Sequence, residues 1–170
     1  SNPGWQVGIH ENTLSWNWKG SNASRYDLGA DHPIHMADGR WHQITVSHDR
    51  AGNACFYKDG VLQRQIDIRS SGDTTTALDI AIGADAKGQF RLSNETQIDE
   101  LRIINRVVSA PEVLAFYEEY RDLVVKSLTE KFSGSLALVG AEQTVADSAF
   151  TLNLHLRTEN MVNVIDEFTS

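Results

Sequence analysis

The feature that most constrains the fold is a series of short strand-like runs, separated by turn residues about every ten positions. Apolar and polar side chains alternate in these runs, as in strands with one buried face. Asp59 and Gly60 form a pair typical of a two-residue hairpin turn. The expected strands are residues 5–9, 14–18, 41–48, 54–58, 61–66, 78–83 and 97–104. This pattern predicts an all-β sandwich or barrel.

The tryptophans of the first runs have two interpretations. Trp16 and Trp18 share a face with Leu14, which favours core packing over an aromatic platform for a sugar ring. Trp41 is also expected to fill the core. His42 is expected to be held by hydrogen bonds, because no nucleophile or acidic partner is placed for catalysis.

The composition excludes several classes of function. The chain has 170 residues, 41% of them hydrophobic, and a net charge of −8. This acidic balance argues against a nucleic-acid partner and leaves carboxylates available for Ca²⁺. No apolar run is long enough to span a membrane. Cys55 is the one cysteine, so no internal disulfide can form. It is expected to be a buried small apolar residue of a strand.

A helix is expected after the strands. Ser109 and Glu112 have the spacing of a capping box, with Pro111 in the first turn, and apolar residues continue at helical spacing to about residue 126. The β pattern resumes in residues 136–139, 150–156 and 161–165. The predicted domains are a sandwich over residues 1–108, a helical linker over 109–132 and a second β-domain over 133–170.

Several motifs in order resemble the laminin G-like, concanavalin A-like jelly-roll family. They are Asn2-Pro3-Gly4-Trp5, Arg25-Tyr26-Asp27, Asp38-Gly39-Arg40-Trp41-His42, Asp49-Arg50-Ala51-Gly52, Tyr57-Lys58-Asp59-Gly60, Ile82-Gly83-Ala84-Asp85, Ile98-Asp99-Glu100-Leu101-Arg102-Ile103, and Asn105 to Glu112. The resemblance covers roughly residues 1–118 and implies an antiparallel jelly-roll β-sandwich with a short C-terminal helix. Family members carry several strands before the Asn-Pro-Gly-Trp segment. The resemblance therefore implies the C-terminal portion of the domain, with residues missing before Ser1.

The tail resembles the opening of a cohesin-like β-sandwich. The resemblance rests on residues 140–145, 148–154 and 160–166, and implies a partial second sandwich. Modules of both families occur in series in large secreted bacterial enzymes. The chain is therefore expected to be an accessory portion of a secreted or cell-surface bacterial protein, whose parent polypeptide can be a hydrolase.

Four residues are candidates for binding a glycan: Asn2, Trp5, Arg25 and Asp27. Trp5 would supply the aromatic surface, and the polar groups would surround a hydroxylated ligand. The alternative for Arg25 and Asp27 is an ion pair that pins a loop. Asp99 is the candidate ligand for a structural Ca²⁺, with loop capping or pairing with Arg102 as alternatives.

Catalysis has little support in the sequence. The glucanases on this fold carry a Glu-x-Asp-x-x-Glu strand, and Glu95, Asp99 and Glu100 do not have that spacing. We therefore expect a non-enzymatic module that binds carbohydrate or targets an attached hydrolase. The alternative is protein–protein attachment, through the cohesin-like part, or an architectural spacer. Glycan binding predicts an exposed aromatic near Asn2, Trp5 and Arg25, whereas a spacer predicts none and a helix whose apolar residues are buried.

Overall fold

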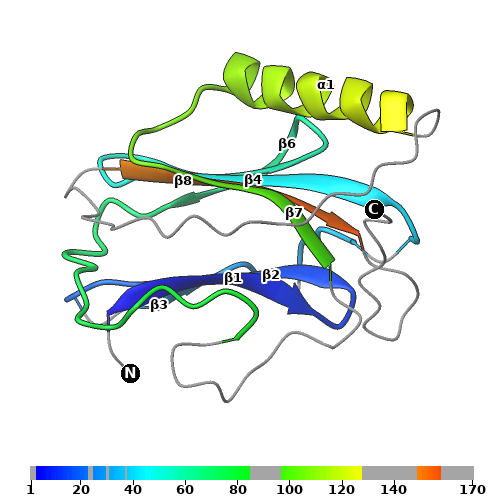
Figure 1. Cartoon of the computed structure of the whole chain (residues 1–170). Coiled ribbons are helices and arrows are strands. Elements are labelled where there is room, and N and C mark those ends of the chain that lie inside the picture. The colour runs from blue at the N-terminus through cyan, green and yellow to red at the C-terminus, as the bar shows by residue number, and fades with distance from the viewer. Residues whose placement is uncertain are drawn as a thin grey trace.

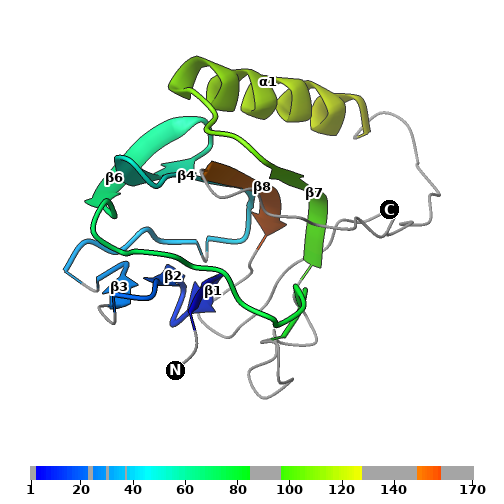
Figure 2. The same cartoon turned by 90° about the vertical axis from the view of Figure 1, so that its left-hand side faces the viewer.

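The computed structural model describes residues 3–22, 25–29, 31–36, 38–84, 97–127 and 149–157. In these residues two antiparallel β-sheets lie face to face, and a helix covers the far side of the larger sheet (Figure 1). The side view shows the same three layers (Figure 2). The expected β-sandwich with one short helix is therefore confirmed.

The smaller sheet contains β1 (Gly4–His10), β2 (Thr13–Lys19) and β3 (Arg25–Asp27), in that order. Glu11 and Asn12 form the turn between β1 and β2, with positive φ angles of 48° and 67°. Asparagine tolerates this left-handed region better than most residues do, which explains the turn expected at Asn12. The register of β1 and β2 pairs Trp5 with Trp18.

The larger sheet has the order β6 (Val61–Asp67), β5 (Asn53–Lys58), β4 (Trp41–Asp49), β8 (Ala149–Arg157) and β7 (Gln97–Ile104). The turn between β5 and β6 is the expected hairpin. Asp59 and Gly60 have φ angles of 52° and 77°, and two successive positive φ angles are typical of the type I′ turn. A register shift between Phe56 and Tyr57 adds a bulge to this hairpin.

Strand β8 lies inside the larger sheet, between β4 and β7 and antiparallel to both. The sequence pattern predicts this strand but assigns it to the start of a second sandwich. In the structure it instead joins the first sandwich, because β4 and β7 each pair with it along an edge that would otherwise be open. The other residues assigned to the second domain, 133–148 and 158–170, lie outside the described residues. The domain division itself therefore stays a prediction.

Both sheets contribute to one apolar core. Its buried members are Leu14, Trp16, Trp18, Ile34, Met36, Ile44, Val46, Ala54, Phe56 and Ile68. Trp16 and Trp18 are 1% and 0% exposed, so their interpretation as core residues is confirmed. Trp41 is half-buried instead of filling the core. Trp41 lies three positions before Ile44, and side chains alternate along a strand, so Trp41 points to the face of β4 opposite the core.

Helix α1 (Ala110–Ser127) covers the outer face of the larger sheet, and its start follows the expected capping box (Figure 1). The Glu112 carboxylate accepts hydrogen bonds from the backbone N–H and the hydroxyl of Ser109, at 2.9 and 2.8 Å. Arg106 pairs with Glu112 at 2.8 Å. The bonds from Arg106 and Ser109 lower the pKa of Glu112 to about 2.

The inner side of α1 is buried. Val113 is 0% exposed and Tyr120 is 7% exposed, and Val113 packs with Tyr57 and Val108. None of the helical segments that the structure describes is long and apolar enough to span a bilayer.

The strand expected over residues 78–83 is wrong. This segment forms no strand, and Leu78, Ile80 and Ile82 are 43%, 43% and 48% exposed. Alternation alone cannot form a strand, because a strand also needs a neighbouring edge with which to pair.

Candidate ligand-binding face

The outer side of the three-stranded sheet is a polar surface. Leu14, Trp16 and Trp18 point into the core, so the alternate residues of these strands point away from it. We call this surface the polar face; it consists of Gly4, Gln6, Gly8, Ser15, Asn17, Lys19, Arg25 and Asp27. In Figure 1 it is the side of β1, β2 and β3 that faces away from the larger sheet.

Gly8 leaves a bare strip of backbone on the polar face. A side chain at Gly8 would have open space, since a Cβ there would meet only the Gln6 amide nitrogen, at 3.9 Å. Neither close packing nor a left-handed φ requires glycine at this position. Glycine inside a strand weakens it and often marks a place where a ligand approaches the backbone closely. The sequence alternation of residues 5–9 contained this signal, but sequence reasoning did not use it.

A row of polar groups crosses the three strands beside this strip. Asn17 is paired with Gln6 on one side and with Asp27 on the other. The Asn17 amide nitrogen donates to Oε1 of Gln6 at 3.1 Å. The amides and the carboxylate provide donors and acceptors in one line, which suits recognition of a hydroxylated ligand.

Arg25 and Asp27 form a two-pronged ion pair at the end of this row. The Arg25 Nε donates to Asp27 Oδ2 at 2.9 Å, and a terminal nitrogen lies 2.9 Å from Oδ1. The hydrogen bond and charge of Asp27 raise the pKa of Arg25 above its ordinary value. Their side chains remain 58% and 44% exposed, so the pair adds little stability and stays open to a ligand.

Trp5 lies on the opposite side of the sheet. It is half-buried and packs against the core, opposite Trp18 in the register. The structure therefore brings Arg25 and Asp27 together but does not place Trp5 with them. Asn2 lies outside the described residues.

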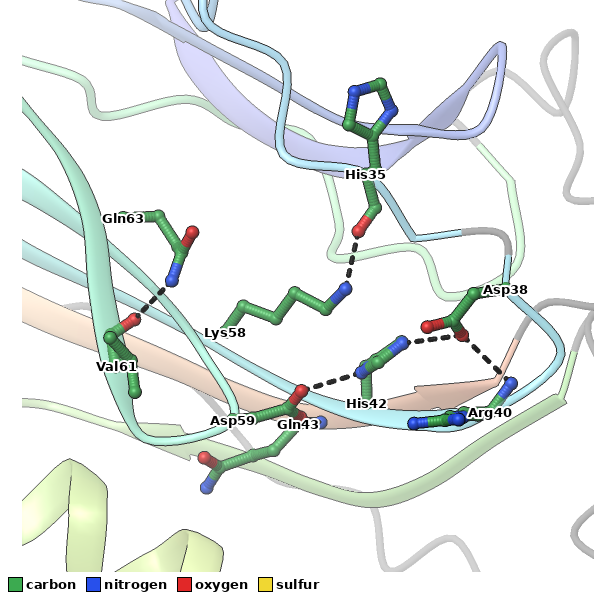
Figure 3. Close-up of polar contacts among 9 residues, drawn as sticks. All are labelled: His35, Asp38, Arg40, His42, Gln43, Lys58, Asp59, Val61 and Gln63. Carbon is green, nitrogen blue, oxygen red and sulfur yellow. Dashed lines mark hydrogen bonds and ion pairs between the residues drawn. The ribbon is translucent and has the colours of Figure 1, made fainter.

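His42 lies at the other end of the sandwich, where it bridges two carboxylates (Figure 3). Its Nδ1 lies 2.7 Å from Oδ2 of Asp59, and its Nε2 lies 2.8 Å from Oδ1 of Asp38. Lys58 donates to the backbone carbonyl of His35 nearby, at 2.7 Å. His42 is only 6% exposed, and the prediction that hydrogen bonds hold it is confirmed. The expectation that no acidic partner is placed with it is wrong, because Asp38 and Asp59 come from a loop and a turn that the fold brings to its ring.

The pKa of Asp38 reflects this bridge. Partial burial alone would raise this pKa. The hydrogen bond and charge of His42, together with the hydrogen bond from the backbone N–H of Arg40, lower it by more than burial raises it. The pKa of Asp38 therefore lies below its ordinary value. The cluster ties the loop before β4 to the β5–β6 turn, which is a structural task.

Asp99 lies at an irregular point of β7. The pairing of β7 with β8 shifts between Asp99 and Arg102, and Glu100 has a positive φ of 49°. The Asp99 carboxylate accepts the backbone N–H of Glu100 at 2.8 Å, and burial raises its pKa. Asp99 thus caps its own bulge, while Arg102 pairs with Glu100 and Glu119, at 3.1 and 3.3 Å.

A calcium ion at Asp99 would need several more oxygen ligands beside this carboxylate. In the part of the chain that the structure describes, no three side chains of His, Cys, Asp or Glu gather as a metal site would need. Backbone carbonyl oxygens also bind Ca²⁺, so calcium at Asp99 stays a prediction.

Comparisons with known proteins agree with this fold. A family model for laminin G-like domains, described as the concanavalin A-like lectin/glucanases superfamily, matches residues 1–114. Among curated proteins, botulinum neurotoxin type G of Clostridium botulinum is 28% identical over an alignment of 124 residues, and the match covers 67% of this chain and 9% of the neurotoxin. The chain thus spans less than a tenth of that relative's length. No solved structure matches the chain significantly. Because the family model covers most of the chain, this protein belongs to the concanavalin A-like lectin/glucanase superfamily, with a laminin G-like domain.

Proposed function

We propose that this chain is a non-catalytic binding module that holds a carbohydrate on its polar face. The observation that carries the proposal is Gly8, a strand-interior glycine with open space above it, beside the row formed by Gln6, Asn17 and Asp27. A sugar ring could approach the bare backbone at Gly8 while its hydroxyl groups meet the amides and the carboxylate. The superfamily description, which includes lectins, supports this ligand class.

The site differs from the one expected from the sequence. Arg25 and Asp27 remain in it, Gln6, Gly8 and Asn17 join it, and the inward-facing Trp5 leaves it. Without a stacking aromatic, affinity would come from hydrogen bonds that compete with water, so we expect weak binding.

The absence of catalysis in this module is also an inference. Glycoside hydrolysis needs two carboxyl groups facing a substrate across a cleft. The carboxylates of Asp38 and Asp59 both bond to the buried ring of His42, which supports a structural role for them. We place the module in a secreted bacterial protein; the Clostridium relative supports the bacterial source.

Architectural spacing or protein attachment is a second candidate. The burial of Val113 and Tyr120 in α1, together with the inward position of Trp5, favours it. In this case the polar face would bind no glycan, and the cohesin-like part would hold a protein partner.

A glycan array followed by calorimetry distinguishes the two candidates. Gly8→Val fills the bare strip with a good strand former, and Asn17→Ala removes the central amide. Both should weaken binding of an array hit at least about tenfold, or 1.4 kcal/mol. Gln65→Ala, on β6 of the other sheet, is the matched control and should bind as wild type does. A folded Gly8→Val variant with unchanged affinity would reject the polar face as the site. An array without hits would favour the spacer.

A further inference from the structure

Strand β4 turns a polar strip toward helix α1. Gln43, Thr45 and Ser47 alternate with the core residues of this strand, so they lie on its other face. Helix α1 covers this face (Figure 1), and the three polar residues are only 0% to 2% exposed. A polar group that leaves water needs a new hydrogen bond, because burial without one costs free energy. Each residue of the strip therefore needs a partner under the helix.

Ser47 has such a partner, whereas the side chain of Gln43 does not. The Ser47 hydroxyl donates to the backbone carbonyl of Val108 at 3.3 Å and accepts the backbone N–H of Val108 at 3.2 Å. In the part of the chain that the structure describes, neither the side-chain nitrogen nor the side-chain oxygen of Gln43 has a hydrogen-bond partner. Gln43 is 1% exposed, so bulk water does not reach its amide.

The backbone fixes the position of Gln43. Its N–H donates to Oδ1 of Asp59 at 3.0 Å, and its carbonyl accepts the backbone N–H of Asp59 at 2.9 Å. Figure 3 shows the side chain pointing away from His42, toward the side of β4 on which α1 lies. Exchanging the nitrogen and oxygen of the amide would not help, because both atoms lack a partner. A partner for this amide must therefore fit between the sheet and the helix.

A second amide on the same face has an unused oxygen. Gln97 on β7 and Trp41 on β4 both pair with Arg157 in the register, so they lie on one face of the sheet. Trp41 is two positions from Gln43 and shares its face. The side-chain oxygen of Gln97 is buried and has no hydrogen-bond partner among the described residues. The covered face thus contains two buried amides that can accept or donate further hydrogen bonds.

We propose that ordered water molecules bind between α1 and the larger sheet, where they bond to the amides of Gln43 and Gln97. A side-chain amide both donates and accepts, and water can meet both needs. A metal ion would meet only the amide oxygen, and an anion only the N–H groups. Buried waters typically make about three hydrogen bonds to polar groups that lack other partners, and they are part of the folded structure. The proposal does not depend on the ligand of the polar face.

The test is NMR detection of water at the side-chain amide of Gln43, in the full isotope-labelled chain with assigned side-chain amides. Water held beneath the helix should give this NH₂ group laboratory-frame and rotating-frame Overhauser effects of opposite sign, which mark a long-lived contact. Gln65, exposed on β6, is the matched control and should show no such contact. A Gln43 amide without a long-lived water contact would overturn the proposal.

A substitution separates a water-bound amide from an amide that is simply unsatisfied. Gln43→Met keeps the length of the side chain but cannot bond to water in the same way. If the amide were unsatisfied, the substitution would remove a buried polar group without losing a bond, and the urea midpoint of unfolding would rise.

With water bound, Gln43→Met leaves the water without one of its partners, so we expect the urea midpoint to fall. Gln65→Met, at an exposed position of β6, should leave the midpoint near that of the wild type. A Gln43→Met midpoint equal to that of the wild type or above it would overturn the proposal. If the variant does not fold, the water contact measured on the wild type decides.

Discussion

The ring of His42 joins two segments that are distant in sequence: its Nδ1 lies 2.7 Å from Oδ2 of Asp59 in the β5–β6 turn. The other oxygen of Asp59 accepts the backbone N–H of Gln43 at 3.0 Å. One carboxylate therefore fixes both the direction of β4 and the hairpin that packs beside it. This cluster shows how the polar residues of the family motif can serve the fold, while the proposed binding surface lies on the other sheet.

Replacing Asp59 tests the energetic weight of this tie. Asp59→Asn keeps the shape of the side chain and tolerates the positive φ of 52°, but it removes the charge opposite His42. We expect the free energy of unfolding, measured with urea, to fall by about 1–3 kcal/mol. Asp67→Asn, at the exposed end of β6, should lower it by less than Asp59→Asn does. Equal effects of the two variants would contradict the account.

The Asp38 carboxylate should contribute stability that disappears in acid. Its pKa is lowered in the folded state, so the contribution is present above the unfolded value of about 3.9 and is lost as the pH falls through the folded value. The stability difference between the wild type and Asp38→Asn should therefore shrink below about pH 4. Urea unfolding at a series of pH values measures it. A difference that stays constant would mean that Asp38 acts without its charge.

Glu112 should titrate near pH 2, because Arg106 and Ser109 both bond to its carboxylate. Arg106→Gln should raise this pKa, which NMR of the side-chain carboxyl carbons measures directly. Arg69→Gln, in an exposed loop, is the control and should leave Glu112 unchanged. Ser109→Ala should also cost about 1 kcal/mol of stability, since it removes the hydroxyl that donates to Glu112 at the helix start. An Arg106→Gln variant with the wild-type titration would show that the ion pair does not form in solution.

Asn153, in the middle of β8, tests whether this strand closes the sandwich. Its Cα is paired with Thr45 on one side and Arg102 on the other. Asn153→Pro removes a backbone donor inside the sheet, so we expect a loss of about 1–3 kcal/mol or more in chemical unfolding. Asn153→Ala keeps the backbone donor and is the matched control. Equal stability of the two variants would show that residues 149–157 do not pair inside the sheet.

The sequence predicted the local structure well where the signal was local. The alternation around Trp16 and Trp18 indicated their burial, the Asp59-Gly60 pair indicated the type I′ hairpin, and the Ser109–Glu112 spacing indicated the helix start. Each of these features depends on residues a few positions apart.

The remaining features depend on pairing between distant segments. The place of β8 between β4 and β7 cannot be read from the alternation of residues 149–157, because the same alternation suits any half-buried sheet. On β2, Trp18 is the partner of Trp5, and the next residue, Lys19, is the partner of Arg25. Successive residues of a strand point to opposite faces, so Trp5 and Arg25 lie on opposite sides of the sheet. The expected site therefore contained residues that no single surface could bring together.

The most direct test of the binding face is NMR chemical-shift mapping with a glycan from the array, on the full chain with assigned backbone amides. Our account predicts shifts concentrated at Gly8, Asn17 and Asp27 on the outer side of β1, β2 and β3, with the amides of β6 unchanged. Shifts confined to the loop and turn around His42, or to β6, with the polar face unmoved, would contradict it.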